Sequence, residues 1–436
     1  MRTATIAFLP VLIALLLVGL SSNGLVASAA GGLSVPGTGG VTAPVSKLAP
    51  TFSVNFTETG LNASRVWSVT LGDVAESTTT SEIGFQVANG TYSYTIVAVG
   101  FYATPASGSV TVKGVEKSIS TDFAAIPITH VVVIVMENGA RTTILKNSPY
   151  QHYLENHYGS VPDYYALCHA SPPNYFSFTS GQTIGCEAPE KVQPVSNIPD
   201  SLQAAGLTWH GYFESMPTPC DTTRSANGLY VAADHNPFLS YEDIRDNKTR
   251  CKANVVNSNA FNSSVANGSL PSFSFYIPNE YDDCHSIPPG LTSLQERHLC
   301  DNWLKGFLGP MLNHTTNASG ALNFNTSQER ALMNQTAFII VYDEGAGTSD
   351  GGYTVGNIVT PYCYTVWGVN QTVCGGSTYI SVVSPYSIGT TFIGNASDMD
   401  VASTIEWLLG VGSDGGLDGT PGYFPALTTL FDFPAQ

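Results

Sequence analysis

A run of six apolar residues at positions 131–136 constrains the fold of this chain most strongly. The run reads Val-Val-Val-Ile-Val-Met, has no polar break, and ends at Glu137 and Asn138. A strand that is apolar on both faces is typical of the centre of a parallel sheet covered by helices. Ligands of such sheets bind just past the carboxyl ends of the strands. Glu137 and Asn138 are therefore candidates to hold a cation or a substrate; the alternative is an ordinary polar turn after a buried strand.

Similar apolar runs recur later in the chain, and segments with helical character separate them. The strand-like runs cover residues 270–277, 337–342 and 379–383. The helix-like segments cover residues 150–158, 198–205, 299–312, 327–334 and 401–409. Alternating β and α elements predict a mostly parallel sheet between helices. We therefore expect an α/β domain over residues 127–434.

The chain before this domain has a different character. Residues 1–30 have the layout of a signal peptide, with Arg2 before an apolar stretch and Ala27-Ser28-Ala29 as the cleavage signal. Residues 31–50 are rich in Gly, Pro and Ser, which predicts a flexible linker. No second apolar segment is long enough to cross a bilayer. The chain is therefore expected to be secreted or held at the cell surface, with no stable membrane span after signal cleavage.

Residues 51–125 consist of short alternating stretches separated by turn signals such as Asn89-Gly90. Several short strands at this spacing predict a small all-β sandwich, of the kind that recurs in secreted archaeal surface proteins. We find no catalytic constellation in this segment. It is expected to serve as a spacer or adhesion module, through which the protein could associate with a cell surface.

Cysteines and sequons agree with export. All eight cysteines lie between Cys168 and Cys374, which allows four disulfides in an oxidising compartment. Neighbouring pairs such as Cys363 with Cys374 are the simplest pairing. About a dozen Asn-x-Ser/Thr sequons, among them those at Asn55 and Asn395, predict a glycosylated surface.

The charge of the chain indicates which environment and which binding partners suit the protein. The net charge is −17, although only 11% of the residues are charged. A surface built largely from Ser, Thr, Asn, Gly and Tyr changes little in charge when carboxylates are protonated, so it suits an acidic exterior. The 16 Lys and Arg residues are spread thinly, which disfavours a nucleic-acid partner.

Acidic and amide residues follow three of the predicted strands. They are Glu137 with Asn138, the segment 279–285, and Asp343 with Glu344. If these strands are neighbours, the carboxylates converge at one edge of the sheet and repel one another unless a cation neutralises them. Oxygen ligands without a thiolate favour a hard or borderline divalent ion, namely Mg, Ca, Mn, Zn or Fe.

Ser171 is a candidate nucleophile. The segment Ser171-Pro172-Pro173 predicts the start of a helix that Gly181 can close. A helix N-terminus attracts an anion such as phosphate, and a serine that touches a metal there can lose its proton. The alternative is simple helix capping by Ser171 without catalysis.

Two histidines complete the candidate chemistry. His235 and His285 lie in polar, turn-like contexts rather than on apolar helix faces. A histidine in such a place can hold a phosphoryl oxygen or protonate a leaving group, especially in acid.

Taken together, these motifs resemble a known family. The chain between residues 130 and 410 is similar to the secreted acid phosphatase and phospholipase C phosphoesterases, relatives of the alkaline phosphatase superfamily. The matching segments, in the order of the family, are residues 130–138, 168–175, 179–181, 209–217, 235–238, 278–285, 301–304, 339–345 and 404–408. The β module lies outside the resemblance.

The resemblance implies roles for individual residues. It implies one divalent metal ion held by Glu137, Asn138, Ser171, Asp343 and Glu344. It implies that the phosphoryl oxygens are bound by Asn174, His235 and His285, with Asp283 orienting His285. In the implied mechanism, Ser171 attacks phosphorus and forms a phosphoserine, which water then hydrolyses.

The expected function is that of an exported, metal-dependent acid phosphatase that hydrolyses small phosphate monoesters. Alternatives are a phospholipase C-like phosphodiesterase and a catalytically inactive glycosylated surface or adhesion protein. The segment Pro172-Pro173-Asn174 is closer to the phosphatase-like branch. Asp398-Met399-Asp400 departs from the family pattern, because many members carry a histidine before the last helix and an associated second metal site. A sulfatase is disfavoured, because neither Cys168 nor Ser171 is followed by the required x-Pro-x-Arg.

Overall fold

The structure is a computed structural model. It describes residues 50–61, 65–98, 100–103, 107–182, 186, 193–313, 327–345, 364–365, 372–373, 375–411 and 426–433. The expected signal peptide, nearly all of the expected linker, and the predicted Cys363–Cys374 pair lie outside these residues. Within the described ranges, no helix is both long enough and apolar enough to cross a lipid bilayer.

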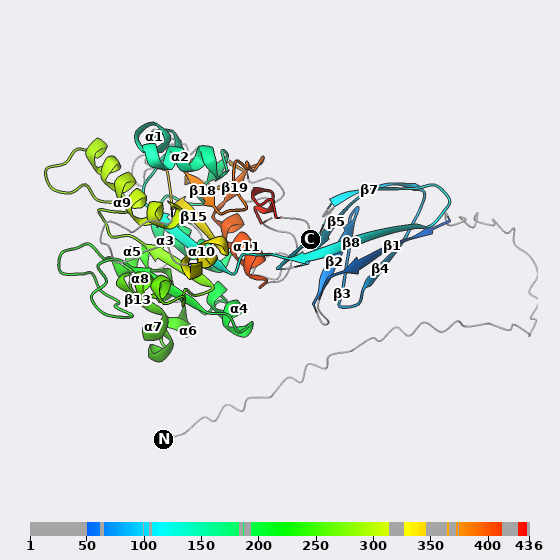
Figure 1. Cartoon of the computed structure of the whole chain (residues 1–436), viewed down its shortest axis with the longest axis horizontal. Helices are drawn as coiled ribbons and strands as arrows, with labels where there is room; N and C mark the ends of the chain where they lie inside the picture. Colours follow the sequence, from blue (N-terminus) through cyan, green and yellow to red (C-terminus); the bar gives the residue numbers. More distant parts are fainter. Residues whose placement is uncertain are drawn as a thin grey trace, which may run out of the picture. The chain divides into compact units, whose positions relative to one another are not determined.

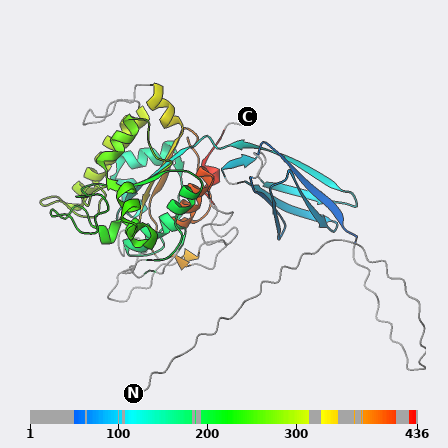
Figure 2. The same cartoon turned by 90° about the horizontal axis from the view of Figure 1, so that it is seen from below.

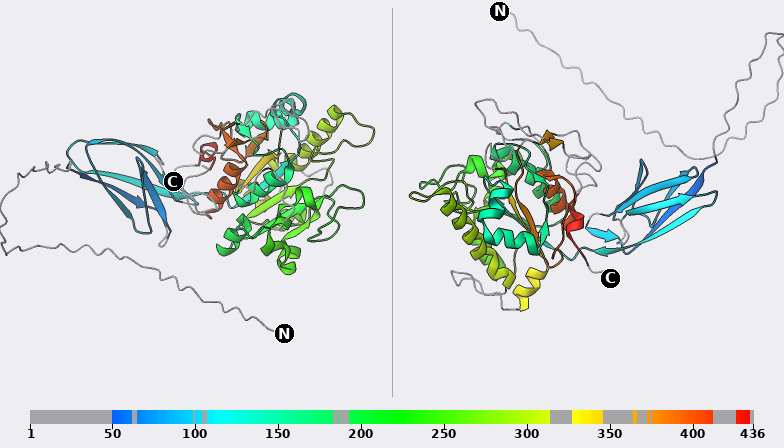
Figure 3. Two further views of the ribbon diagram at one scale, coloured as in Figure 1. Left: turned by 180° about the vertical axis from the view of Figure 1, so that it is seen from behind. Right: turned by 90° about the horizontal axis from the view of Figure 1, so that it is seen from above.

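The predicted all-β region is confirmed. Its eight strands are β1 (Phe52–Thr59), β2 (Trp67–Leu71), β3 (Val74–Thr78), β4 (Glu82–Val87), β5 (Gly90–Val97), β6 (Phe101–Ala103), β7 (Ser107–Val112) and β8 (Lys117–Ala125). They form two four-stranded sheets, with the orders β4-β1-β8-β6 and β3-β2-β5-β7. Figure 3 shows this all-β region in blue to cyan from two further sides. Alternating side chains such as Val54, Phe56, Trp67 and Val69 are buried between the sheets, which is the pattern of a sandwich.

A seven-stranded sheet dominates the rest of the chain. Its strands, in spatial order, are β10 (Gly159–Ser160), β18 (Ile380–Val383), β15 (Thr336–Tyr342), β9 (His130–Met136), β14 (Phe273–Ile277), β12 (Trp209–Phe213) and β13 (Val255–Asn257). The five strands from β15 to β13 run parallel, whereas β18 and β10 are antiparallel additions. The prediction of a mostly parallel sheet with residues 131–136 near its centre is confirmed.

Helices flank this sheet on both sides (Figure 1; Figure 2). They are α1 (Arg141–Asn147), α2 (Pro149–His157), α3 (Ser171–Ser180), α4 (Ile198–Ala204), α5 (Ala232–His235), α6 (Glu242–Arg245), α7 (Lys248–Asn254), α8 (Asn259–Ala266), α9 (Ser293–Asn313), α10 (Ser327–Asn334) and α11 (Asp398–Leu409). Two short 3-10 helices cover Pro237–Ser240 and Thr428–Leu430. The remaining strands form two small pairs: β11 (Tyr164–Tyr165) with β19 (Ala396–Ser397), and β16 (Tyr364–Thr365) with β17 (Thr372–Val373).

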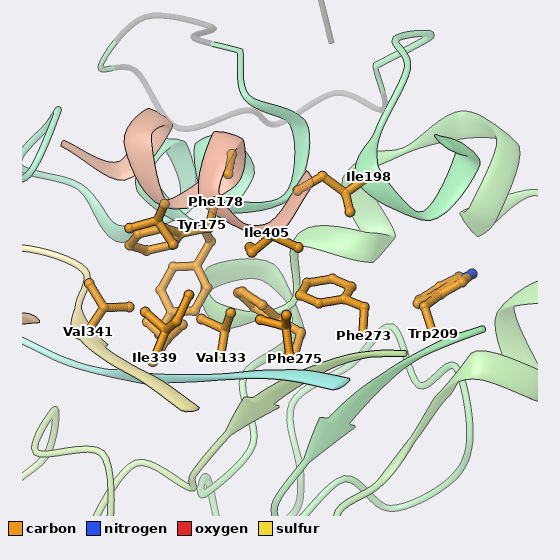
Figure 4. Close-up of a cluster of buried hydrophobic side chains, with 14 of the residues drawn as sticks. Val133, Tyr175, Phe178, Ile198, Trp209, Phe273, Phe275, Ile339, Val341 and Ile405 are labelled. Carbon is orange, nitrogen blue, oxygen red and sulfur yellow. The ribbon is translucent and has the colours of Figure 1, made fainter. Parts of the chain in front are cut away.

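Both faces of β9 are buried, as its apolar run predicts. Alternate residues belong to different cores: Val131, Val133 and Val135 pack with α3 and α11, and Val132, Ile134 and Met136 pack with α9. Figure 4 shows Val133 and Phe275 pointing from the sheet toward Tyr175 of α3 and Ile405 of α11. Each large side chain buried in this way contributes roughly 1.5–3 kcal/mol. The end of β9 is therefore a rigid platform for the residues that follow it.

Candidate active site

The acidic residues that follow β9 and β15 meet at one edge of the sheet. The backbone N–H of Asp343 donates to Met136 O at 3.0 Å, and that of Asn138 donates to Asp343 Oδ1 at 3.2 Å. One step further, the N–H of Gly139 donates to Glu344 O at 2.8 Å. Pairing of the two parallel strands thus brings together segments about 200 residues apart, as expected from the sequence.

Helix α9 holds the turn at Asn138 through a hydrogen bond from Arg297. Asn138 adopts a left-handed backbone conformation with φ of 53°, which is uncommon for a residue other than glycine. Its carbonyl oxygen accepts a hydrogen bond from Arg297 Nη2 of α9 at 3.1 Å. The side chain of Asn138 donates to Glu137 Oε2 at 3.2 Å. The turn therefore fixes both expected ligands, Glu137 and Asn138, relative to each other.

Ser171 lies at the N-terminus of α3, and its hydroxyl points to Glu137. Ser171 is the first helical residue, Ala170 occupies the capping position, and no side chain caps the helix. The Ser171 hydroxyl instead donates to Glu137 Oε2 at 3.1 Å. The capping alternative is therefore not what the structure shows. Pro172 and Pro173 have no N–H, so the first turn of α3 offers an anion fewer backbone donors than an ordinary helix start.

In the structure, Asn174 contacts the backbone of the chain before Ser171. Its carboxamide accepts from the backbone N–H of Cys168 at 2.9 Å and donates to the oxygen of Cys168 at 2.9 Å and to that of Ala170 at 3.4 Å. These contacts use both ends of the carboxamide on the chain before Ser171. In this geometry Asn174 holds the loop that leads to Ser171, and its expected role in binding a phosphoryl oxygen stays a prediction.

Asp398 holds the preceding part of the same loop. Its carboxylate accepts from the Tyr164 hydroxyl at 2.5 Å and from the backbone N–H of Leu167 at 3.2 Å. The side chain is fully buried. Asp398 therefore has structural partners in the segment that leads to Ser171.

His235 lies between carboxylates at the centre of the candidate site. Its Nε2 is 3.1 Å from Glu137 Oε1, and its Nδ1 is 3.2 Å from Glu280 Oε1 and 3.7 Å from Asp283 Oδ2. The ring stacks on Tyr175, whose hydroxyl donates to Glu137 Oε1 at 2.7 Å. Burial lowers the pKa of His235 to about 4, against the opposing effect of Glu280. His235 therefore connects the Glu137 side of the site to the segment after β14.

The ring of His285 contacts Glu280 and not Asp283. Its Nδ1 lies 2.7 Å from Glu280 Oε2, whereas Asp283 Oδ1 accepts from the backbone N–H of His285 at 2.8 Å. The hydrogen bond with Glu280 raises the pKa of His285. The expected role of Asp283 in orienting His285 stays a prediction, and Glu280 is a further carboxylate in contact with the His285 ring. Sequence reasoning missed Glu280, because nothing distinguishes it from the other acidic residues of segment 279–285.

His169 is a second residue that sequence reasoning did not single out. Its Nδ1 lies 3.4 Å from Glu344 Oε2, and its side chain is 7% exposed. It stands two residues before Ser171, inside the motif quoted for the resemblance. His169 could have been singled out from the sequence, because a residue two positions before Ser171 is expected to lie near the same edge of the sheet.

Comparison with known proteins decides the family. A model of the phosphoesterase family matches residues 145–411, more than half of the chain. The chain belongs to the phosphoesterase family. This confirms the resemblance seen in the sequence motifs.

Two relatives of this phosphoesterase carry the names of phosphatases. A probable acid phosphatase of Kluyveromyces lactis is 29% identical over 206 residues, which cover 44% of this chain and 47% of the relative. A phosphatidylinositol-3-phosphatase of Mycobacterium tuberculosis is 31% identical over 207 residues, covering 45% of this chain and 64% of the relative. The chain thus spans about half to two thirds of the length of these relatives.

The chain is also similar to a protein of known structure. It is a protein of the alkaline phosphatase superfamily from Vibrio parahaemolyticus, with a TM-score of 0.45, 13% identity and coverage of 71% of each chain.

Burial and mutual repulsion shape the electrostatics of the phosphoesterase site. Burial, and then the charges of Asp343, Asp283 and Glu344, raise the pKa of Glu137 well above its usual range. Burial and the neighbouring Glu344 raise the pKa of Asp343 to about 7. Such crowding of carboxylates is costly unless a proton or a cation offsets it.

The residues fit a divalent cation. Asp343 Oδ2 and Glu344 Oε2 are buried and have no hydrogen-bond partner among the described residues. The nearby donors are carboxylate, amide and hydroxyl oxygens, which suit a hard or borderline ion.

Among the described residues, groups that could hold a cation also occur around the two histidines, His235 and His285. Two sets place their ligand atoms within 4.8 Å of one another: Glu137, His235 and His285, and His235, Glu280 and Asp283. Asp343 and Glu344 belong to neither set and are linked to Glu137 through Asn138 and Ser171. The site is therefore one continuous cluster, with its oxygen-rich part around Ser171.

Proposed function

We propose that this phosphoesterase is an exported, metal-dependent acid phosphatase that hydrolyses phosphate monoesters through a phosphoserine at Ser171. The observation that carries the proposal is the contact between the Ser171 hydroxyl and Glu137 Oε2, at 3.1 Å. The contact supports the proposal because the hydroxyl of the first residue of α3 lies beside clustered carboxylates. That combination suits attack on a phosphoryl group.

One divalent metal ion would be held by Glu137, Asn138, Ser171, Asp343 and Glu344. When bound, it would lower the pKa of the Ser171 hydroxyl and offset negative charge on the phosphoryl group. It would also offset the mutual repulsion of the carboxylates, because each is then paired with a positive charge.

Residues of the protein carry out two phosphoryl transfers, first from the substrate to Ser171 and then from Ser171 to water. The Ser171 hydroxyl passes its proton to Glu137 Oε2, and Oγ attacks phosphorus. The bond from phosphorus to the alcohol oxygen breaks, and the departing alcohol takes a proton from protonated His285. Water then gives a proton back to His285 and attacks the phosphoserine, Ser171 Oγ takes its proton back from Glu137 as its bond to phosphorus breaks, and inorganic phosphate leaves. The histidines His235 and His285 hold the phosphoryl oxygens, and Asn174 fixes the loop that carries the nucleophile.

Monoesters are the favoured substrates. The related proteins named above are called acid phosphatase and phosphatidylinositol-3-phosphatase, and both names denote release of phosphate from a monoester. A binding protein without catalysis is disfavoured, because Glu137, Ser171, Asp343 and both histidines are all retained and gathered together.

Export is supported by the cysteines. Among the described residues, three disulfides join neighbouring cysteines, namely Cys168–Cys186, Cys220–Cys251 and Cys284–Cys300. Disulfides form and persist in oxidising compartments outside the cytosol. Their number fits a protein that acts outside the cell.

The test is hydrolysis of p-nitrophenyl phosphate and of bis-p-nitrophenyl phosphate between about pH 3 and pH 8. We expect faster turnover of the monoester, a maximum on the acid side, and loss of activity in chelator that a divalent ion restores. Ser171→Ala should lower kcat by at least about a thousandfold. Ser177→Ala is the matched control, because the Ser177 hydroxyl on the same helix donates only to the carbonyls of Pro173 and Gln182.

Each arm can contradict the proposal. Preference for the diester would favour the phosphodiesterase alternative. Absence of turnover with either ester, at every pH and with each metal, would favour a non-catalytic surface protein. Full activity of Ser171→Ala would exclude Ser171 as the nucleophile.

A further inference from the structure

We propose that Glu280 is a positioning residue that clamps the two active-site histidines, His235 and His285, through its two carboxylate oxygens. Oε1 faces His235 Nδ1 at 3.2 Å, and Oε2 contacts His285 Nδ1 at 2.7 Å. The two rings meet edge to face with centroids 5.1 Å apart. A single carboxylate thus touches both rings, and this sets their separation and orientation.

The backbone around Glu280 is anchored, so the carboxylate is fixed as well. The N–H of Glu280 donates to Leu229 O at 3.2 Å, and its carbonyl accepts from the N–H of Ser286 at 2.7 Å. The Ser286 hydroxyl donates to Glu280 Oε2 at 3.1 Å. The side chain is 3% exposed. A carboxylate buried to this extent is costly without partners. Oε2 has the Ser286 hydroxyl and His285 Nδ1 as partners, whereas Oε1 makes no hydrogen bond among the described residues and has His235 Nδ1 beside it at 3.2 Å.

The other ring nitrogen of His235 faces the proposed nucleophile and metal site. Its Nε2 lies 3.1 Å from Glu137 Oε1, the carboxylate that also receives the Ser171 hydroxyl through Oε2. A ring nitrogen of His285 lies within 4.8 Å of ligand atoms of Glu137 and His235. Glu280 therefore holds both imidazoles against the Glu137 side of the site, where the phosphoryl group would be bound.

His285 depends most on the clamp. Its side chain is 37% exposed, whereas that of His235 is 4% exposed and stacked on Tyr175. With Nδ1 occupied by Glu280, Nε2 is the ring nitrogen left to act on a substrate oxygen. Without Glu280, the exposed His285 ring can rotate into solvent, while packing still holds His235.

Glu280→Gln is an informative variant. A carboxylate offers an acceptor oxygen to each ring, but a carboxamide of the same shape offers one oxygen and one NH₂ group. The NH₂ group cannot accept from a protonated Nδ1. The substitution therefore removes one half of the clamp and leaves the volume of the side chain almost unchanged.

This inference rests on the proposed function, so the experiment has one arm with turnover and one without. In the first arm, p-nitrophenyl phosphate kinetics are compared for wild type, Glu280→Gln, Glu280→Ala and the control Glu406→Gln, a buried glutamate of α11. We expect kcat to fall by about tenfold to a hundredfold in both Glu280 variants, with KM changed less than about threefold. Glu406→Gln should leave both constants near those of wild type.

A double variant tests whether Glu280 acts through His285. In the His285→Ala background, Glu280→Gln should cause at most about a twofold further loss, because the ring that it positions is gone. In the second arm, ¹⁵N NMR of the imidazoles should show the His285 Nδ1 signal of wild type altered in Glu280→Gln, whether or not the protein turns over the ester.

Several results would overturn the inference. One is a kcat within about twofold of wild type for both Glu280 variants. Another is an unchanged His285 signal. A third is a lower ratio of bound metal to protein in Glu280→Gln than in wild type, which would make Glu280 a cation ligand. If wild type has no turnover but the imidazole signal changes as expected, the clamp is supported and only the proposed function fails.

Discussion

At the scale of single residues, the candidate site depends on the tightly packed turn at residues 137–139. Gly139 follows the ligand turn, and a Cβ at this position would lie 2.3 Å from the ring of Tyr342 and 2.5 Å from Ile144. Tyr342 and Ile144 are fully buried, so neither has space to withdraw. The absence of a side chain at Gly139 lets the chain after Glu137 pass close to β15.

Gly139→Ala should therefore destabilise the protein by about 1–3 kcal/mol through overpacking. The matched control is Gly306→Ala in α9, because a Cβ there meets nothing within 4 Å. That control should be neutral or stabilising by up to about 1 kcal/mol, since alanine is the better helix former. Urea unfolding midpoints of the two variants give the comparison. Equal midpoints would show that the Gly139 site can relax.

The residue scale is also where sequence reasoning reaches its limit. Glu137, Asp343 and Ser171 could be predicted, because each marks the end of an apolar strand or the start of a helix. The partners of Asn174, Asp283 and Glu280 could not. Which of several neighbouring polar side chains faces a ring depends on backbone torsions, such as the φ of 77° at Cys284, that no pattern in the sequence specifies.

At the scale of elements, apolar runs predicted most of the large sheet. The parallel pairing of β9 with β15 follows from two uninterrupted apolar runs. Strand β12 was not predicted, because Trp209–Phe213 includes a histidine and a glycine and so lacks a clear apolar run. Helix α11 begins at Asp398 and not at residue 401, because Ser397 and Asp400 form a capping box that starts the helix earlier. Polar capping residues such as Ser397 and Asp400 therefore indicate where a helix begins, which the apolar pattern alone does not.

A disulfide joins two elements next to the histidines. Cys284 lies between Asp283 and His285, and it is bonded to Cys300 of α9. The Cys220–Cys251 disulfide joins the segment after β12 to α7. The first disulfide closes a loop of 16 residues and the second a loop of 31. Because the entropy of loop closure grows only with the logarithm of loop length, the two disulfides should stabilise the fold by similar amounts.

Replacing Cys284 and Cys300 by serine should cost about 3 kcal/mol of stability, and replacing Cys220 and Cys251 a similar amount or slightly more. Activity should respond differently. The first pair of substitutions frees the segment that carries His285, so kcat should fall more than in the second pair. Chemical denaturation and steady-state kinetics on both double variants measure the two effects. A larger loss of kcat in the Cys220/Cys251 variant would contradict this assignment.

At the scale of the whole molecule, buried carboxyl groups make stability depend on pH. Outside the proposed metal ligands, burial raises the pKa of Glu406 to about 8 and that of Asp400 to about 7, and burial together with the charge of Asp282 raises that of Glu214 to about 7. In the folded state these groups hold protons at pH values where the unfolded chain has released them. Their contribution to stability is complete below the usual carboxyl pKa and is lost as the pH rises through about 7 to 8.

The free energy of unfolding should therefore be larger near pH 5 than near pH 8, by roughly a few kcal/mol. Glu406→Gln removes one group that resists ionisation, so it should raise stability on the alkaline side, by roughly 2 kcal/mol, and flatten the profile. Urea unfolding at several pH values tests this expectation. A protein that becomes more stable as the pH rises would contradict it, and would also weaken the case for an acidic working environment.

The central claim is that Ser171 becomes phosphorylated during turnover. The most direct measurement is acid quenching of the metal-loaded protein during hydrolysis of a phosphate monoester, followed by mass spectrometry of its peptides. We predict one phosphoryl group on the peptide that contains Ser171, assigned to that serine by fragmentation, and none in Ser171→Ala. A phosphoryl group on another residue, or steady turnover in Ser171→Ala, would contradict the account.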